Sequence, residues 1–235
     1  GYPTGKGDSS LTRGVIFDLD GVLVATDEAH YQAWKRLADE EGIPFDRTIN
    51  ERLKGVGRMD SLNIILEHAT RVYSAGEKAA LAERKNGAFQ ARLAKLTSAD
   101  VLPGGRRLLD DLRRRGIRIA VASSSKNARL ILDRLELGRF FDAVADGHDV
   151  TRSKPHPEVF LLAAERLGLP PRACLVLEDA LAGIEAGRRA GMAVFGIGTP
   201  QTLPGVEHLA PGLVGVTVDL LLAIQHQQSS PPPGA

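Results

Sequence analysis

Hydrophobic and polar positions follow two different periods along this chain. Residues 13–17 form a short, largely apolar run, which is the pattern of a buried strand. Over 27–41 the apolar residues recur at helical spacing, and the Gly-Ile-Pro stretch at 42–44 ends this predicted helix. Two more helices are predicted over 58–68 and 77–96, with no convincing strand between the first helix and the last. We therefore expect this segment to be all-helical.

After residue 97 the pattern changes to an alternation of strands and helices. This order is typical of a doubly wound, mostly parallel sheet. A helix opened by residues 102–105 runs to residue 115, and Gly116 is expected to be its C-cap. The other predicted elements are strands over 117–122, 143–145, 173–177 and 193–197, and helices over 127–136, 157–167 and 180–190.

The two patterns together predict an α/β fold with an inserted helical domain. We expect an α/β core formed by residues 11–26 and 97–224, and a helical insertion formed by residues 27–96. Residues 1–10 are rich in Gly, Ser and Thr, and residues 225–235 end in Ser-Ser-Pro-Pro-Pro-Gly-Ala. Both terminal stretches are expected to be flexible.

Composition narrows the class of protein. Of the 235 residues, 43% are hydrophobic and 25% are charged, which is ordinary for a globular protein. The 30 Lys and Arg residues nearly balance the 29 Asp and Glu residues. The chain therefore has no excess of basic residues that would indicate nucleic acid or an anionic membrane as a partner. No apolar stretch resembles a membrane span or a signal peptide, so a cytoplasmic protein is expected. Cys174 is the single cysteine, which excludes a disulfide framework, and it lies in an apolar run.

Acidic residues follow two of the predicted core strands. Asp18 and Asp20 come after the strand over 13–17, and Glu178 and Asp179 come after the strand over 173–177. In an extended backbone Asp18 and Asp20 would project to one side, and two carboxylates so close repel unless a cation lies between them or one keeps a proton. One can then act as a nucleophile while the other moves protons. Because ligands bind at the carboxyl ends of strands in such sheets, we expect these residues in one crevice.

Two other groups are predicted at the same edge of the sheet. Ser123, Ser124 and Ser125 lie between a strand and a helix, where free backbone N–H groups make an anion site. Lys154 lies in a loop that the two prolines after it, Pro155 and Pro157, make rigid, and there it can neutralise phosphoryl charge. Carboxylate oxygens suit Mg²⁺. The combination predicts phosphoryl transfer through an aspartyl-phosphate.

Each of these features also has a purely structural interpretation. An Asp-x-Asp pair after a strand is commonly a turn. Glu178 and Asp179 could cap the helix that follows them, as Ser123 could cap its own. A surface lysine is normally solvated. The convergence of all four features on one crevice favours the chemical interpretation.

Asp18-Leu19-Asp20-Gly21, Ser123, Lys154 and Glu178-Asp179 match, in this order, the four motifs of the haloacid dehalogenase (HAD) superfamily. The resemblance covers nearly the whole chain and implies a HAD-like, Rossmann-like core with the helical insertion as its cap domain. It implies Asp18 as the nucleophile and Asp20 as the general acid/base. It also implies Mg²⁺ held by Asp18, the backbone carbonyl of Asp20 and Asp179, with Glu178 beside the ion.

Within this superfamily, residues 30–34, 51–61 and 84–86 of the cap and residues 98–104 and 122–127 of the core resemble the β-phosphoglucomutase family. A bisphosphorylated sugar intermediate needs one anion site at the reacting phosphoryl group and a second for the distal phosphate. Ser123 and Lys154 would form the first. The cap residue Arg58, suited to bidentate phosphate binding, would form the second with core residues. The residues expected at the substrate are Thr26, His30, Trp34, Lys54, Gly55, Val56, Arg58, Ser61, Lys85, Ser124, Ser125, Lys126 and Asn127.

The cap residues leave alternatives open. His30 and Trp34 are four residues apart on one helix, so both could simply pack against the core. Lys85 could be no more than a solvated helix residue. The sequence departs from the family at Ala25, where an aspartate is usual, and at Gly57, where a serine is common. Neither position carries the nucleophile, the acid/base or a metal ligand, so the departures bear on cap closure and specificity.

The resemblance implies interconversion of β-D-glucose 1-phosphate and glucose 6-phosphate, with Mg²⁺ and β-glucose 1,6-bisphosphate as cofactors. We expect a monomer, because the cap must open and close. Small sugar phosphates would be its only partners. One alternative is a Mg²⁺-dependent sugar-phosphate phosphatase with the same core, in which water completes the reaction. Another is a non-catalytic module that binds phosphorylated metabolites, which is disfavoured because binding alone would not require Asp20.

Overall fold

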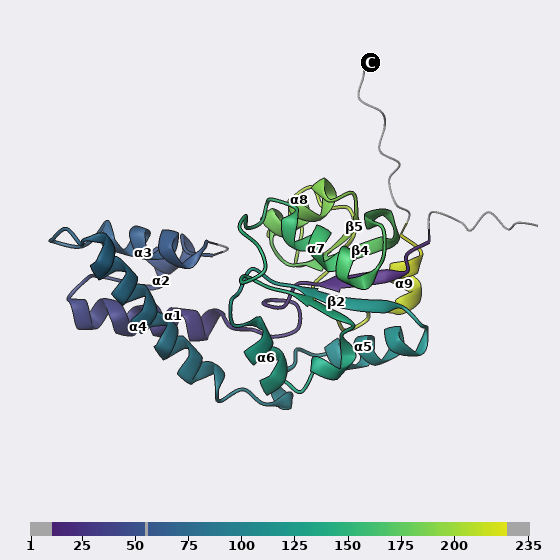
Figure 1. The fold of residues 1–235 in the computed structure, drawn as a ribbon, viewed down its shortest axis with the longest axis horizontal. Coiled ribbons are helices and arrows are strands. Elements are labelled where there is room, and N and C mark those ends of the chain that lie inside the picture. The colour runs from purple at the N-terminus through teal and green to yellow at the C-terminus, as the bar shows by residue number, and fades with distance from the viewer. Residues whose placement is uncertain (1–10, 55, 225–235) are drawn as a thin grey trace, which may run out of the picture.

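Six parallel strands form one sheet in the order β3-β2-β1-β4-β5-β6, in a computed structural model that describes residues 11–54 and 56–224 (Figure 1). Strand β1 is central and pairs with β2 on one side and β4 on the other, so that Gly14 lies beside both Arg118 and Cys174. The strands are β1 (Gly14–Phe17), β2 (Arg118–Ala122), β3 (Ala143–Ala145), β4 (Cys174–Glu178), β5 (Ala193–Ile197) and β6 (Leu209–Ala210).

Helices cover both faces of the sheet, as the alternating side chains of its strands require (Figure 1). Val15 and Phe17 of β1 join the apolar cluster on one face, and Ile16 joins the cluster on the other. The first face is covered by α5 (Gly105–Arg114), α6 (Ala128–Arg134) and α9 (Val218–Leu222), and the second by α7 (Glu158–Leu167) and α8 (Leu181–Arg189). The predicted doubly wound sheet is therefore confirmed.

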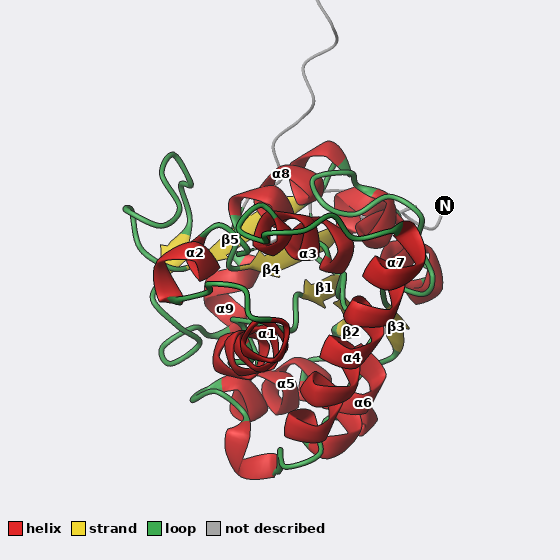
Figure 2. Cartoon of the chain, turned by 90° about the vertical axis from the view of Figure 1, so that its left-hand side faces the viewer, coloured by secondary structure: helices red, strands yellow, loops and turns green. Residues whose placement is uncertain are grey.

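The described part of the predicted cap, residues 27–54 and 56–96, contains only helices and their connections, as expected. These helices are α1 (Asp27–Glu41), α2 (Arg47–Glu51), α3 (Arg58–Leu66) and α4 (Ala75–Leu93). They lie beyond the carboxyl ends of the strands (Figure 2). Gly42 ends α1 in the left-handed conformation, with φ of 67°, and its N–H reaches the carbonyl groups of the last turn.

Helix α4 joins the cap to the core. Leu81 and Ala82, in its first half, belong to an apolar cluster within the cap, together with Trp34. Phe89 and Leu93, in its second half, belong to the large cluster of the core. Hydrophobic contacts therefore run continuously across the predicted division at residues 96 and 97, and the division into two domains remains a prediction.

Several elements differ from the predicted pattern. Helix α2 was not predicted, because it has no buried residue to create a periodicity and is held instead by the Asp46 side chain, which caps the N–H of Ile49. The short β6 and α9 were missed for a similar reason, since too few residues carry a pattern. The predicted helices over 58–68 and 77–96 end earlier, at Leu66 and Leu93. The cap residue of α5 is Arg115, and Gly116 follows it with φ of 70°.

No helix in the described part of the chain is both long and apolar enough to cross a membrane. Gly55 and the terminal stretches 1–10 and 225–235, for which we predicted a substrate contact and flexibility, lie outside the described residues.

Candidate active site

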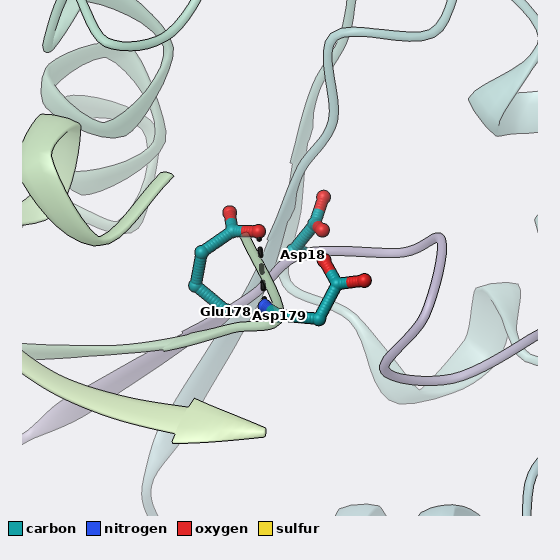
Figure 3. A group of neighbouring side chains, drawn as sticks. All are labelled: Asp18, Glu178 and Asp179. Carbon is teal, nitrogen blue, oxygen red and sulfur yellow. Dashed lines mark hydrogen bonds between the residues drawn. The ribbon is translucent and has the colours of Figure 1, made fainter. Parts of the chain in front are cut away.

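Three neighbouring strands bring the predicted catalytic residues to one edge of the sheet. Asp18 follows β1, Ser123 follows β2, and Glu178 ends β4 with Asp179 directly after it. Because β1 lies between β2 and β4, these side chains lie where the strand order of the sheet reverses. Ligands bind at this position in such sheets. Figure 3 shows the carboxylates of Asp18, Glu178 and Asp179 gathered at this point.

The backbone does not stay extended between Asp18 and Asp20, which corrects our expectation from the sequence. It turns after β1, where the carbonyl of Leu19 accepts the N–H group of Leu23 at 2.9 Å and Gly21 has φ of 81°. A Cβ atom on Gly21 would lie 1.9 Å from Oδ2 of Asp179, so only glycine fits this turn.

The turn separates the environments of the two aspartates. The Thr26 hydroxyl donates a short hydrogen bond to Oδ1 of Asp20. Burial, opposed by this hydrogen bond and reinforced by the negative charge of Asp18, raises the pKa of Asp20 to about 6. Asp20 is thereby suited to holding a proton.

Lys154 reaches back to the nucleophile position from the loop before α7. Its Nζ lies 3.1 Å from Oδ1 of Asp18, 2.9 Å from Oε2 of Glu178 and 3.1 Å from the carbonyl oxygen of Ala122. Burial alone would favour the neutral amine, but the carboxylates of Asp18 and Glu178 outweigh it and raise the pKa of Lys154. The ammonium group is therefore held at the nucleophile with its charge intact.

Asp18, Glu178 and Asp179 fit a divalent cation. Oxygen atoms from the three carboxylates lie within 4.8 Å of one another, and only one cationic side chain, Lys154, is paired with them among the described residues. Burial and the neighbouring negative charges raise the pKa of both Glu178 and Asp179, which is the response of carboxylates whose charge is not fully compensated.

Glu178 differs from the other two because the protein already occupies both its oxygens. Oε1 accepts the N–H groups of Asp179 and Ala180, at 3.1 and 3.2 Å, and Oε2 accepts Lys154. Those N–H groups precede α8, so the alternative that Glu178 caps the helix is wrong. Asp18 and Asp179 are the better candidate ligands, with Glu178 as their support. The Asp20 carboxylate is not part of this oxygen group, which agrees with the expectation that Asp20 would bind the cation through its backbone carbonyl and keep its carboxylate for proton transfer.

The loop after β2 presents the predicted serine cluster. The hydroxyl oxygen of Ser123 accepts the N–H of Ser125 at 3.1 Å, and that of Ser125 accepts the N–H of Asn127 at 3.0 Å. The cap residue of α6 is Asn127, so the alternative that a serine simply caps this helix is wrong. The two hydroxyls instead link Ser123 to Asn127 through consecutive hydrogen bonds to backbone N–H groups of the loop.

In the cap, Lys85 is buried rather than solvated, which rejects that alternative. Its Nζ donates to Nδ1 of His30 at 2.8 Å and lies 4.8 Å and 4.6 Å from the ring centres of Trp34 and Phe89. The His30 ring stacks on Phe89 with 3.9 Å between ring centres. Burial and the Arg58 charge lower the pKa of Lys85 to about 7, and burial lowers that of His30 to about 3. These residues thus combine aromatic packing with a polar contact, and their part in substrate binding remains a prediction.

A second polar cluster joins the cap to the core. Nη2 of Arg58 donates to Oδ1 of Asn86 at 3.0 Å, and Nδ2 of Asn127 donates to the same oxygen at 3.1 Å. Nε2 of Gln90 donates to Oδ1 of Asn127 at 3.0 Å. We call Arg58, Asn86, Gln90 and Asn127 the cap–core cluster. It brings together Arg58 and Asn127, which the sequence had predicted to share a phosphate.

The remaining predicted residues are placed less uniformly. Lys54 is exposed and pairs with Glu51 at 3.1 Å, and Val56 is exposed as well. Ser61 is buried and donates to the carbonyl of Val56 at 3.3 Å. Ser124 and Lys126 are exposed, and the Lys126 carbonyl lies 3.1 Å from Nε2 of His148.

Sequence reasoning missed the contacts of four residues. Asn86 and Gln90 are four residues apart on α4, which places both on the face toward Asn127. Gly183 supports Glu178, since a Cβ atom there would lie 2.0 Å from the Glu178 carboxyl carbon. For Lys85 a signal was present: Leu81, Lys85, Phe89 and Leu93 follow one another every four residues, which puts the lysine inside an apolar stripe.

Several known proteins are similar to this chain in sequence and in fold. The family model for haloacid dehalogenase-like hydrolases matches residues 12–191. A β-phosphoglucomutase from Bacillus subtilis is 44% identical over 92% of this chain and 95% of its own length. The solved β-phosphoglucomutase from Clostridium difficile is 38% identical, with a TM-score of 0.83 over 90% of this chain and 96% of the other.

A phosphorylated carbohydrates phosphatase from Thermotoga maritima is also similar, at 33% identity over 78% of this chain and 84% of its length. The family match, the motif residues at the sheet edge and the shared fold agree with one another. This chain belongs to the haloacid dehalogenase-like hydrolase family.

Proposed function

We propose that this protein interconverts β-D-glucose 1-phosphate and glucose 6-phosphate through an aspartyl-phosphate and β-glucose 1,6-bisphosphate. The observation that carries the proposal is the cap–core cluster, in which Arg58 of the cap and Asn127 of the core donate to one oxygen, that of Asn86. A mutase must hold a second phosphate away from its nucleophile, whereas a phosphatase for monophosphates has no such need. The high identity to β-phosphoglucomutases supports the same activity.

At the start of each catalytic cycle, Asp18 would carry a phosphoryl group. A sugar hydroxyl attacks the phosphorus atom, its proton passes to the Asp20 carboxylate, and the bond between phosphorus and the Asp18 oxygen breaks. The bisphosphate then turns round, so that Asp18 attacks its other phosphate. The bond from phosphorus to the sugar oxygen breaks, and Asp20 returns its proton to that oxygen.

Other residues of the site would stabilise charge during both transfers. The Lys154 ammonium, 3.1 Å from Asp18, faces the position of the transferring phosphoryl group. Asp18 and Asp179, with the Asp20 carbonyl, would hold Mg²⁺, which when bound offsets phosphoryl charge. Ser123 would donate to a phosphoryl oxygen. The cap, with His30, Lys85 and Arg58, would close over the sugar and exclude water. Monomeric state and cytoplasmic location remain predictions.

The proposal is tested by a coupled assay for glucose 6-phosphate from β-glucose 1-phosphate, with Mg²⁺ and a trace of β-glucose 1,6-bisphosphate. Free phosphate is followed in the same reaction. We expect glucose 6-phosphate without stoichiometric phosphate, and no turnover after chelation of Mg²⁺ or in Asp18→Asn. Phosphate release without isomerisation would identify a sugar-phosphate phosphatase instead, and no turnover of either kind would support a binding module.

A further inference from the structure

We propose that Gln90 is a positioning residue that fixes the orientation of the Asn127 carboxamide, so that the distal phosphate meets an N–H donor and not an oxygen. The inference rests on the proposed function, because it gives Asn127 a phosphate to bind. It concerns Gln90, an exposed residue of α4 that would act on the phosphate only through Asn127.

An asparagine side chain has two different ends, and rotating it by a half turn exchanges donor and acceptor. Asn127 is buried, with 6% of its surface exposed, so each end needs a partner from the protein. Nε2 of Gln90 donates to Oδ1 at 3.0 Å, and this directs Nδ2 to the opposite side. There Nδ2 meets Oδ1 of Asn86, which Arg58 also approaches.

The reversed orientation would place two N–H groups against the N–H₂ group of Gln90. It would also turn the oxygen of Asn127 toward Oδ1 of Asn86 and toward any anion bound beside Arg58. Both changes would leave the buried Asn127 side chain with donor facing donor and acceptor facing acceptor. A donor at position 90 therefore determines which end of Asn127 the anion site presents.

Position 90 is well placed to do this because its part of α4 belongs to the core. Phe89, next to it, and Leu93, one turn on, are packed in the core cluster. Asn86 is one turn earlier on the same helix face. Asn127 is thus held between two residues of one helix. Gln90 donates to its side-chain oxygen, and Asn86 accepts from its side-chain nitrogen.

The chemistry makes an ordered prediction for substitutions at position 90. Gln90→Lys keeps a donor toward Oδ1 and should keep the orientation. Gln90→Leu removes the donor, and Gln90→Glu offers only acceptors, which favour the reversed carboxamide. A residue that mattered only for shape would give the opposite order, because glutamate is nearly isosteric with glutamine and lysine is not.

The experiment measures binding of β-glucose 1,6-bisphosphate by titration calorimetry in the Asp18→Asn background, which prevents turnover. We expect the dissociation constant to rise about fivefold to tenfold in Gln90→Leu, further in Gln90→Glu, and to stay within about twofold in Gln90→Lys. In an Asn127→Ala background the three variants should bind alike, because the residue on which position 90 acts is gone.

Gln32 is the control position for the effect of changing charge on the cap. Its side chain donates a hydrogen bond to Glu28 at 2.9 Å. Gln32→Lys and Gln32→Glu should leave binding unchanged. Wild-type affinity in Gln90→Leu, or an order that persists without Asn127, would overturn the inference. Since the readout is binding and not isomerisation, it stays informative if the coupled assay shows that the protein is a phosphatase.

Discussion

Lys154 of the core and Lys85 of the cap are both largely withdrawn from solvent, and the protein treats the two charges in opposite ways. Lys154, in the core, lies within 3.1 Å of two carboxylates, which raise its pKa above the ordinary value. Lys85, in the cap, meets a neutral imidazole and two aromatic rings, and burial lowers its pKa to about 7. The Lys154 side chain is 10% exposed and Lys85 is 3% exposed, so exposure does not explain the difference.

The difference lies in what completes each site. A buried ammonium group is costly unless an opposite charge is near it. The core supplies that charge itself, through Asp18 and Glu178, and the site is charged before any ligand arrives. At Lys85 the negative charge of Asp20 favours the ammonium form, but burial and the positive charge of Arg58 outweigh it, so Lys85 would gain its counter-charge from an anionic ligand. The same substitution, lysine to methionine, should therefore have opposite effects in the two regions.

The largest effect is expected from Lys154→Met. It leaves Asp18 and Glu178 without their cation, so the free energy of unfolding should fall by about 3 kcal/mol. Activity should fall by about 100-fold to 1000-fold, because the charge at the transferring phosphoryl group is lost. Stability is measured by urea denaturation in the presence of a chelator, so that no divalent cation replaces the lost charge.

Lys154→Arg is the matched control, since it keeps the charge while changing the shape. It should recover a large part of the stability and little of the activity. An unchanged free energy of unfolding in Lys154→Met would mean that the two carboxylates do not depend on the lysine, and the comparison would fail on its core side.

Lys85→Met should instead stabilise the protein. The lowered pKa of Lys85 means that the folded state holds its proton less tightly than the unfolded state, whose value is near 10.5. Below about pH 7 the folded protein bears the whole cost of the buried charge, and this cost declines as the pH rises toward 10.5. Methionine removes the cost but leaves Nδ1 of His30 without its donor. We expect a net gain of about 2 kcal/mol at pH 7, and less at pH 9.5.

Urea denaturation at the two pH values checks this expectation. The double variant that carries Lys85→Met and His30→Ala controls for the imidazole left without its hydrogen-bond donor. If Lys85→Met destabilised the protein at pH 7 as Lys154→Met does, Lys85 would already have its counter-charge in the free protein. Substrate affinity should fall in Lys85→Met even as stability rises.

The two regions also differ in how much the sequence predicts. In the core, alternating strands bring Asp18, Ser123 and Glu178 to one edge of the sheet by chain order alone, and the structure has them there. A two-residue period says nothing about the turn after β1, so the extended backbone expected through Asp20 was wrong. Gly21 was the clue, because it must approach Asp179 closely.

In the cap, helical periodicity predicts the helices but not which residues meet across to the core. Gln90 and Asn127 are 37 residues apart, and no local pattern links them. Lys85 was predicted at the substrate, yet its burial depended on α1 and α4 packing together, which gives it His30 and Trp34 as neighbours. Contacts of this kind follow from tertiary packing, which is beyond the reach of a pattern in one segment.

The smallest effect tests whether the two regions unfold as one. Ser74 begins α4 with a capping box, accepting the N–H of Glu77 at 3.1 Å while the Glu77 side chain accepts the N–H of Ser74 at 3.1 Å. Ser74→Ala should lower the free energy of unfolding by about 1 kcal/mol. Because α4 carries residues of both apolar clusters, we expect the loss to be shared by the cap and the core.

Trp34, the single tryptophan, reports on the cap cluster through its fluorescence, and far-ultraviolet circular dichroism reports on the whole chain. The two transitions should coincide in the wild type and shift together in Ser74→Ala. A fluorescence transition that moved alone would show that the cap unfolds separately. The opposite effects of the two lysine substitutions would then belong to two independent units, because the stability of Lys85's surroundings would no longer be coupled to that of Lys154's.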